Sequence, residues 1–147
     1  MSRTISRIIK ATLIVILFVA TIVVWFFALP SRVGELTVTF LDVGQGDAIL
    51  IEAENGNQVL IDGGRGRSVL SELSKVTPFY DRTIDIIIAT HPDEDHIGGL
   101  PEIIKRFVVG AFLESGVQGE TATYRALSSE LEQKNIPVYK ARSGMRI

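Results

Sequence analysis

Cysteine is absent from the chain, and histidine occurs only twice in 147 residues. The absence of cysteine excludes disulfide scaffolds, thiolate zinc sites, cysteine nucleophiles and iron–sulfur clusters. Internal repeats and low-complexity tracts are also missing, and the length fits one ordinary domain. A mean hydropathy of +0.29 is high for a chain with 22% charged residues, so the apolar residues must be concentrated in one segment.

That segment lies near the N-terminus, where the run from Ala11 to Leu29 contains no charged residue. At about 1.5 Å per residue, such a helix reaches roughly 28 Å, close to the hydrocarbon thickness of a bilayer. Three basic residues precede the run and only Arg32 follows it closely, so the positive-inside rule predicts a cytoplasmic N-terminus. Trp25, Phe26 and Phe27 would then form an aromatic belt at the outer interface.

A cleaved signal peptide, a buried core helix and a mitochondrial transit peptide are the alternatives to an anchor. The run exceeds the usual signal core of about 7–15 residues and lacks a small-residue cleavage site, and it is not amphipathic like a transit peptide. We therefore predict a single uncleaved anchor, followed by a domain on the far side of the membrane. The predicted parts are a basic cytoplasmic tail (1–10), a transmembrane anchor (11–29), a linker (30–35) and an exported domain (36–147).

The exported part is acidic. Residues 31–147 carry 12 Lys and Arg against all 17 Asp and Glu, a net charge of −5. This balance argues against a basic nucleic-acid platform that works by bulk charge. Bound divalent ions would offset the charge only locally.

The periodicity of the exported part predicts an α/β layered domain. Three short strands come first, and the tight turns between them predict an antiparallel start to the sheet. Helices then alternate with strands, and the aliphatic run 83–90 is typical of a strand buried on both faces. The expected strands are 36–43, 48–52, 58–61, 83–90, 108–113 and 136–139, and the expected helices are 67–75, 101–107 with Pro101 at its first position, and 121–135.

Both histidines fall in one hexapeptide, His91-Pro92-Asp93-Glu94-Asp95-His96, directly after the predicted strand 83–90. A loop at a strand end is well placed to aim several side chains at one point. His91 and Asp93 are two residues apart and face the same side of an extended loop, whereas Asp95 and His96 can face a second point nearby. Imidazole and carboxylate ligands suit divalent Zn, Mn or Fe, so the hexapeptide predicts a metal cluster.

Two further features bear on this prediction. The glycines Gly98 and Gly99 allow the following helix to pack closely behind the hexapeptide. Asp62 ends the predicted strand 58–61 and is well placed to orient a metal ligand from behind. The alternatives are a solvated acidic turn that caps a helix, with the histidines present by chance, and an ordinary turn aspartate at position 62.

Three segments in order resemble the motifs of the metallo-β-lactamase fold, and within it the exported hydrolase-like domain of the ComEC competence proteins. They are Phe40 to Ala48 (FLDVGQGDA), Leu60 to Gly64 (LIDGG) and Thr90 to Leu100 (THPDEDHIGGL). The general fold has histidine at the position of Asp93, and an aspartate there is similar to the ComEC branch. The resemblance covers about residues 36 to 140 and implies an αββα layered fold, of which this chain would hold the first half to two-thirds.

The resemblance also implies roles for the site residues. His91 and Asp93 would bind one metal ion, and Asp95 and His96 a second, with Zn or Mn expected. Asp95 would in addition act as a catalytic residue that orients the attacking hydroxide. Two such ions stabilise the charge of an attacked phosphodiester.

The remaining motif residues would lie close to the metal ions. Asp62 would support the cluster, and Gln45 and Asp47 would lie beside it without an assigned role. The resemblance implies DNA processing during uptake at a bacterial cytoplasmic membrane, but it does so for proteins with a channel domain, and this chain has one anchor and no channel.

The sequence departs from the family pattern after the hexapeptide. The second half of the fold supplies a bridging Asp and further His, and residues 97–147 contain neither residue type. We therefore expect a domain that is incomplete at its C-terminus. Such a chain would bind metal weakly, or bind a single ion, would hydrolyse little by itself, and would depend on a missing half or a partner for further ligands.

Three functions remain open at this stage. The first is a membrane-anchored, ComEC-like, metal-dependent hydrolase directed at phosphodiesters, with DNA as a possible partner. The second is a non-catalytic binding or scaffold module on the same fold. The third is a metallohydrolase that acts on a lactone, a thioester or a cell-wall fragment, which the net charge of −5 mildly favours.

Overall fold

The computed structural model describes residues 2–28 and 34–146, with side chains described from 7 to 25 and from 34 to 146. The chain divides into two units, residues 1–32 and 33–147, which are considered separately. The first contains helix α1 (Ser2–Ala28). The predicted linker as far as residue 33, and the side chains of Phe26 and Phe27, lie outside the described parts.

Within the described residues, α1 holds one segment that is long and apolar enough to cross a membrane. The segment is Arg7–Trp25, with a mean hydropathy of 2.6 and no residue buried inside the structure. Its bounds lie four residues before those of the predicted anchor. Length and composition alone do not separate a span from a signal sequence, which passes the same criterion.

The second unit is built on a six-stranded mixed sheet with the order β1-β2-β3-β4-β5-β6. The first three strands are antiparallel, as predicted, and β3 to β6 run parallel to one another. Each parallel connection passes through helix or a long loop, because parallel neighbours need a crossover. The strands are β1 (Thr37–Phe40), β2 (Ile49–Glu52), β3 (Gln58–Ile61), β4 (Thr83–Ala89), β5 (Val108–Glu114) and β6 (Val138–Lys140).

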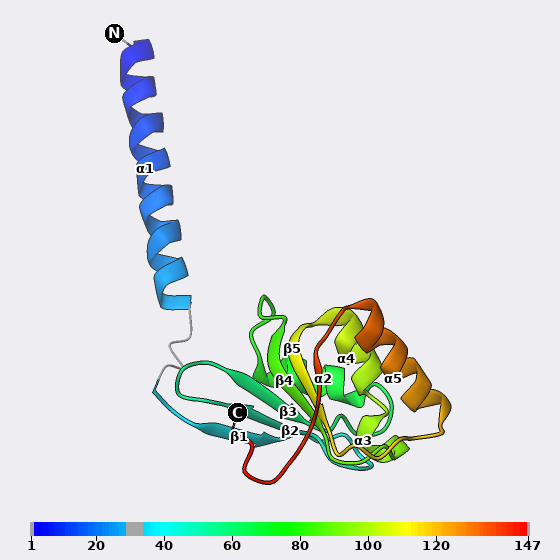
Figure 1. Cartoon of the computed structure of the whole chain (residues 1–147). Helices are drawn as coiled ribbons and strands as arrows, with labels where there is room; N and C mark the ends of the chain where they lie inside the picture. The colour runs from blue at the N-terminus through cyan, green and yellow to red at the C-terminus, as the bar shows by residue number, and fades with distance from the viewer. Residues whose placement is uncertain (1, 29–33, 147) are drawn as a thin grey trace. The chain divides into compact units, whose positions relative to one another are not determined.

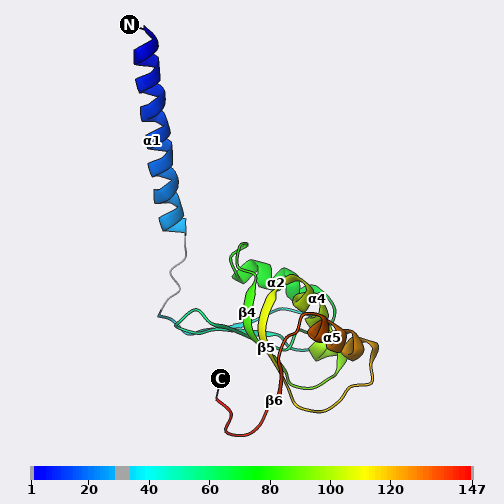
Figure 2. The ribbon, with the colours of Figure 1, turned by 45° about the horizontal axis from the view of Figure 1, so that its top comes forward.

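The helices of this unit gather on one face of the sheet (Figures 1 and 2). They are α2 (Ser68–Val76), α3 (Glu94–Ile97), α4 (Leu100–Arg106) and α5 (Ala122–Gln133). The core lies between the helices and the strands, where Leu50, Leu60, Ile87 and Phe112 are at most 1% exposed. Alternation along each strand puts these side chains on the helix side of the sheet.

The opposite face of the sheet carries only apolar side chains along its central register. The paired positions run across the whole sheet and consist of Val38, Phe40, Ile49, Ile51, Val59, Ile61, Ile86, Ile88, Ala111, Leu113 and Tyr139. We call this set the open face. In the described part of the chain no helix covers it, and Phe40 is 77% and Tyr139 51% exposed. Leu113 is 5% exposed, at the end of this face where Met145 and Arg146 lie beside it.

The prediction that strand 83–90 is buried on both faces is therefore wrong for half of its side chains. Ile86 and Ile88 are half-buried, because they point to the open face. Ala111 of β5 also points to the open face, and it is therefore less buried than predicted. Val108 is 70% exposed for another reason, since it begins the strand at the rim of the sheet.

Smaller differences concern the ends of elements. The predicted strand 36–43 is reduced to β1, and Leu41 and Val43 are buried in the irregular segment that follows it. The helix predicted to begin at Pro101 begins one residue earlier, and the short helix α3 precedes it. The helix predicted over 121–135 is confirmed as α5, with Thr121 as its N-cap.

Candidate metal centre

The candidate ligands follow two neighbouring parallel strands. β3 and β4 pair in parallel, so their carboxyl ends meet at one edge of the sheet. Asp62 follows β3 directly, and Thr90 and His91 follow β4, while α3 brings Asp95 and His96 to the same edge. Strand ends are rigid, and this placement explains why residues about 30 positions apart in sequence come into contact.

Asp62 is the buried acceptor at the centre of this edge. Its side chain is 3% exposed, and its backbone adopts a φ of 58°, a left-handed conformation that costs about 1–3 kcal/mol in a residue other than glycine. Asp62 Oδ1 accepts a hydrogen bond from the Thr90 backbone N–H at 2.8 Å. Its Oδ2 accepts from the Thr90 hydroxyl at 2.6 Å and from His96 Nδ1 at 2.8 Å. These contacts exclude an ordinary solvated turn aspartate.

The same network fixes the proton positions on both imidazoles. Because Asp62 is an acceptor, the hydrogen bond to His96 requires the proton on His96 Nδ1. The Thr90 hydroxyl gives its proton to Asp62, so its oxygen accepts from His91 Nδ1, which lies 2.9 Å away. Both rings therefore keep Nε2 unprotonated when neutral, and Nε2 is the atom left to bind a metal ion.

The two imidazoles and two of the carboxylates lie near one another. The ring centroids of His91 and His96 are 3.7 Å apart. His91 Nε2 lies 3.6 Å from Asp93 Oδ2, and His96 Nε2 lies 3.9 Å from Asp95 Oδ2. The two predicted pairs, His91 with Asp93 and Asp95 with His96, thus lie beside each other, and within them His96 is 13% exposed and Asp93 is 71% exposed.

These donors fit a divalent ion in kind, since imidazole nitrogen and carboxylate oxygen suit Zn and Mn. The positions of these side chains do not yet form a complete set of metal ligands. Among the described residues, no three or more His, Asp or Glu side chains are arranged to hold a metal ion. The cluster therefore provides the right types of donor, in pairs, without a closed coordination shell.

The turn that contains Gln45 and Asp47 forms a wall of the site. Gly46 has a φ of +80°, and a Cβ at this position would overlap the carbonyl oxygen of Asp95. Gln45 and Asp47 are exposed, and Asp47 contributes its backbone carbonyl, which accepts from the Gly64 N–H at 2.9 Å. Gln45 shares a groove with Asp95, whereas the contact of Asp47 is made by its backbone, so a role of the Asp47 side chain beside the candidate ligands stays a prediction.

Gly99 serves the close packing that the sequence predicted. Its N–H donates to the Gly64 carbonyl at 3.1 Å, and a Cβ at position 99 would overlap the carbonyl oxygen of Gly63. The segment that ends α3 therefore lies directly against the turn that follows Asp62. A neighbouring hydrogen bond, from the Gly63 N–H to the His96 carbonyl at 2.7 Å, ties His96 to the same turn.

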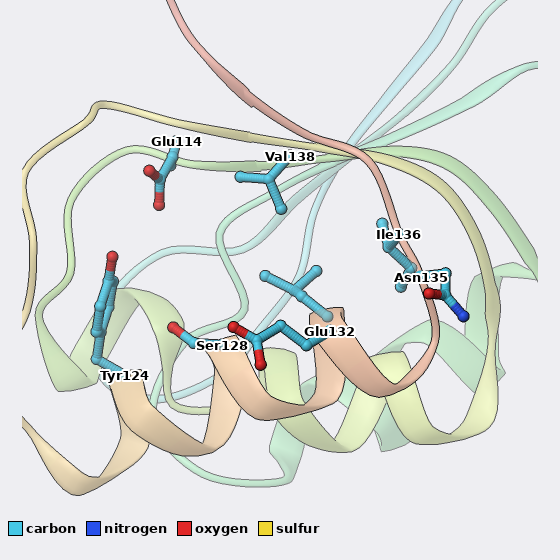
Figure 3. A pocket seen from close by; sticks show the side chains of 8 residues that line it. Glu114, Tyr124, Ser128, Glu132, Asn135, Ile136 and Val138 are labelled. Atoms are coloured by element: carbon cyan, nitrogen blue, oxygen red, sulfur yellow. The ribbon is translucent and has the colours of Figure 1, made fainter.

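A hollow of about 530 Å³ lies elsewhere, between α5 and the ends of β5 and β6. At one end Tyr124 points toward Glu114, with Val138 and Ile136 along the wall (Figure 3). Burial, and then the charge and hydrogen bond of Glu114, raise the pKa of Tyr124. The side chains that line this hollow include none of the predicted site residues, so it is separate from the candidate centre.

Two residues of the site were missed by the sequence interpretation. Thr90 was read only as part of a motif, although a hydroxyl next to a histidine at a strand end was a usable signal. Arg65 was not considered. Its N–H donates to the Gln45 carbonyl at 3.1 Å, and its guanidinium donates to Gln45 Oε1 at 3.0 Å, beside Asp95.

Comparisons with known proteins bear on the whole domain. A family model described as "Metallo-beta-lactamase superfamily" matches residues 41–141. Among solved structures, a similar one is the rubredoxin oxygen:oxidoreductase from the anaerobe Desulfovibrio gigas, with a TM-score of 0.50 and 20% identity. The match covers 76% of this chain and 32% of that one, so the chain spans about a third of that structure's length. At this identity the likeness concerns the fold alone. A search of curated proteins gives no match.

Proposed function

The chain belongs to the metallo-β-lactamase superfamily, and on that premise we propose that it is a membrane-anchored, metal-dependent hydrolase of the ComEC type, directed at phosphodiesters. The observation that carries the proposal is the Asp62 network. A single buried carboxylate engages the Nδ1 atoms of the chain's two histidines, directly at His96 and through Thr90 at His91, and so leaves both Nε2 atoms for a metal ion.

In this proposal His91, Asp93, Asp95 and His96 hold the metal, and Asp62 orients His96 from behind. When bound, divalent ions of the Zn or Mn type supply Lewis-acid stabilisation of the charge that develops on an attacked phosphodiester. The chain's own residues position that chemistry. In the proposal Asp95 accepts a hydrogen bond from the attacking water and orients it, which is supported by its position at the start of α3 beside the Gln45 turn.

Full activity requires further ligands, because the described donors approach one another only in pairs. We propose that they come from a partner or from another segment that packs on the open face, and that such a segment completes a two-ion site. An apolar face of this extent normally marks an interaction surface. The chain alone is therefore expected to bind metal weakly or as a single ion, with little hydrolysis.

The direction toward nucleic acid is the most specific part of the proposal. It is supported by the likeness of residues 40–48 to the opening motif of ComEC proteins, and it extends to a role in DNA uptake. The net charge of −5 in residues 31–147 supports a second candidate, a hydrolase of a neutral ester or thioester. A scaffold that had lost its site is a weaker candidate, since it would not need a buried Asp62 that orders both imidazoles.

The location is also proposed. The predicted anchor, residues 11–29, overlaps the apolar segment Arg7–Trp25 and is proposed to cross a bacterial cytoplasmic membrane once, with the N-terminus in the cytoplasm and the catalytic domain outside. The basic residues Arg3, Arg7 and Lys10 support this orientation through the positive-inside rule.

Titration of the full chain with Mn²⁺ in a non-ionic detergent tests the proposal, with the free ion followed by electron paramagnetic resonance. His91→Gln and His96→Gln should each weaken binding at least about tenfold, since loss of a ligand costs more than loss of its support. Asp42→Asn is the control, because Asp42 is exposed and lies outside the cluster. Equal binding by the wild type and both histidine variants would refute the proposed site.

Hydrolysis of bis(p-nitrophenyl) phosphate by the same preparation tests the need for further ligands. We expect little or no turnover from residues 1–147 with Mn²⁺ or Zn²⁺. Robust turnover that is lost in His96→Ala would show that the described residues already form a complete site.

A further inference from the structure

A groove of about 440 Å³ opens beside the candidate centre and contains one cationic group. Its walls are formed by Gln45, Gly46, Arg65, Glu94 and Asp95. The groove therefore joins the turn after β1 to the first residues of α3. Any substrate that reaches Asp95 from this side passes the Arg65 guanidinium.

The position of Arg65 is fixed by backbone contacts. Its N–H donates to the Gln45 carbonyl at 3.1 Å, and the N–H of the preceding Gly64 donates to the Asp47 carbonyl at 2.9 Å. Gly46 between these acceptors lies directly against the Asp95 carbonyl. The base of the Arg65 side chain is thus held at a set place relative to α3.

The guanidinium of Arg65 retains free hydrogen-bond donors. Gln45 Oε1 accepts from one of its terminal nitrogens at 3.0 Å. Among the described residues, Arg65 forms no ion pair with a carboxylate, whereas Arg67, two residues later, pairs with Glu102 at 3.4 Å. Guanidinium groups carry five N–H donors in a planar fork that matches the oxygens of phosphate and carboxylate groups.

We propose that Arg65, held by Gln45, is the residue that recognises the negative charge of the substrate, and that the substrate is a phosphodiester monoanion. This inference rests on the proposed function and names the residue that recognises its substrate. It also gives Gln45 a role, which is to orient the guanidinium over the groove.

The other charges of the groove decide which anion fits. Glu94 and Asp95 lie in the same groove and disfavour a highly charged ligand. A phosphodiester carries one negative charge, whereas a phosphate monoester carries about −1.5 to −2 at neutral pH. One guanidinium beside two carboxylates therefore suits the diester better than the monoester, and a neutral ester gains little from Arg65, because hydrogen bonds to uncharged acceptors are weaker.

Calorimetric titration of the full chain in non-ionic detergent tests this inference, with and without Zn²⁺. The probes are the deoxydinucleotide d(TpT), its uncharged methylphosphonate analogue and thymidine monophosphate. The variants are Arg65→Gln and, as a matched control, Arg67→Gln, which removes an arginine from the same segment but outside the groove.

Arg65→Gln should weaken d(TpT) binding about tenfold or more, because it removes hydrogen bonds between a guanidinium and a phosphate, which are stronger than those between neutral groups. Arg67→Gln should change it less than about twofold, since exposed ion pairs contribute little. The analogue should bind wild type and Arg65→Gln alike, and the monophosphate should bind more weakly than d(TpT). Glu94→Gln should tighten d(TpT) binding, because it removes a repelling carboxylate.

Three results would overturn the inference: equal affinity of the wild type for d(TpT) and its neutral analogue, equal effects of the two arginine substitutions, or no tightening in Glu94→Gln. The absence of d(TpT) binding would count as the first of these. The Mn²⁺ titration separates the two proposals. If His91→Gln and His96→Gln bind Mn²⁺ as the wild type does, the proposed hydrolase is refuted. If metal binding depends on the histidines but d(TpT) binding does not depend on Arg65, only the role of Arg65 is refuted.

Discussion

At the scale of single residues, the candidate centre depends on a hydroxyl that links an acid to a ring. Thr90 donates to Asp62 and accepts from His91 Nδ1, so it transmits the orientation of a buried carboxylate to a half-exposed imidazole. A direct contact, by contrast, holds His96. Asp62 therefore orders His96 by a direct hydrogen bond and His91 through the Thr90 hydroxyl.

Thr90→Val keeps the shape of the side chain and removes its hydroxyl. We expect Mn²⁺ affinity to fall about tenfold, the lower range for loss of a group that orients a ligand. Thr90→Ser should restore the affinity, and Thr83→Val, at the other end of β4, should leave it unchanged. The same Mn²⁺ titration measures all three, and an unaltered affinity in Thr90→Val would show that His91 is ordered without Thr90.

Gly46 and Gly44 offer a matched pair in one turn. Both have a positive φ near 80°, but only a Cβ at position 46 meets another atom, the Asp95 carbonyl oxygen. Alanine at either position should cost about 1–2 kcal/mol for the left-handed backbone. Gly46→Ala should cost at least about 1 kcal/mol more, because the turn must move off α3. Denaturant unfolding of both variants checks this, and equal losses would mean that the turn does not pack on α3.

At this scale the sequence predicted which residue types form the candidate centre better than it predicted which of their side chains are in contact. The spacing of His91 and Asp93 in an extended loop correctly placed their side chains on one side. The pairing of His96 with Asp62 required the parallel register of β3 and β4, which no local pattern contains. Arg65 was missed because an arginine between glycines is also typical of an ordinary turn.

At the scale of elements, Glu102 ties α4 to the start of α2. It lies 3.4 Å from Arg67 and 3.2 Å from Lys105, with Arg106 also within 3.4 Å. The hydrogen bond from Lys105 is the largest cause and lowers the pKa of Glu102. Burial comes second and raises it, and the charges of Arg67, Lys105 and Arg106 each lower it further, so that the net shift is downward. The carboxylate is thus favoured in the folded state.

A lowered folded-state pKa means that the stabilisation is present above the unfolded value near 4.5 and is lost as the pH falls through the folded value. Glu102→Gln should therefore unfold at lower denaturant than the wild type at pH 7. The difference should shrink as the pH falls below the unfolded value toward the lowered folded-state pKa, where the wild-type carboxyl takes up its proton. Glu54→Gln, in the turn between β2 and β3, is the control. A difference that does not change with pH would contradict the ionic origin.

Most elements could be predicted because their signals are local. The residues of β3 were predicted without error, and α5 was recognised from the helical spacing of Tyr124, Leu127 and Leu131. The short helix α3 was missed, since four residues dominated by acids carry no periodicity. The over-long prediction for β1 arose because Leu41 and Val43 are buried by the site's turns rather than by strand pairing.

At the scale of the whole domain, the sheet has one covered face and one open face. The aliphatic run 83–90 predicted burial on both sides, and its composition is that of a strand with two apolar environments. In the described chain the helices supply only one of them. The unmet half of that prediction is the reason to expect that another segment or partner packs against Ile86, Ile88 and their neighbours.

Two alanine substitutions compare the stability contributed by the covered face of the sheet with that contributed by the open face. Leu50→Ala, beneath the helices and fully buried, should cost about 2–5 kcal/mol of unfolding free energy. Phe40→Ala, on the open face and 77% exposed, should cost less than about 1 kcal/mol in the isolated chain. Denaturant unfolding in detergent checks both values. A loss at Phe40 as large as that at Leu50 would show that the open face is already covered.

The central claim is that one buried aspartate presents the Nε2 atoms of both histidines to a metal ion, and nitrogen-15 NMR of the imidazole rings tests it most directly. The chain contains only two histidines, so the spectrum of His91→Gln assigns each ring. Without metal, at a pH where both rings are neutral, both should show a protonated Nδ1 and an unprotonated Nε2, and Zn²⁺ should shift the Nε2 resonances selectively. A protonated Nε2 on either ring, or Nε2 resonances that do not respond to Zn²⁺, would contradict the account.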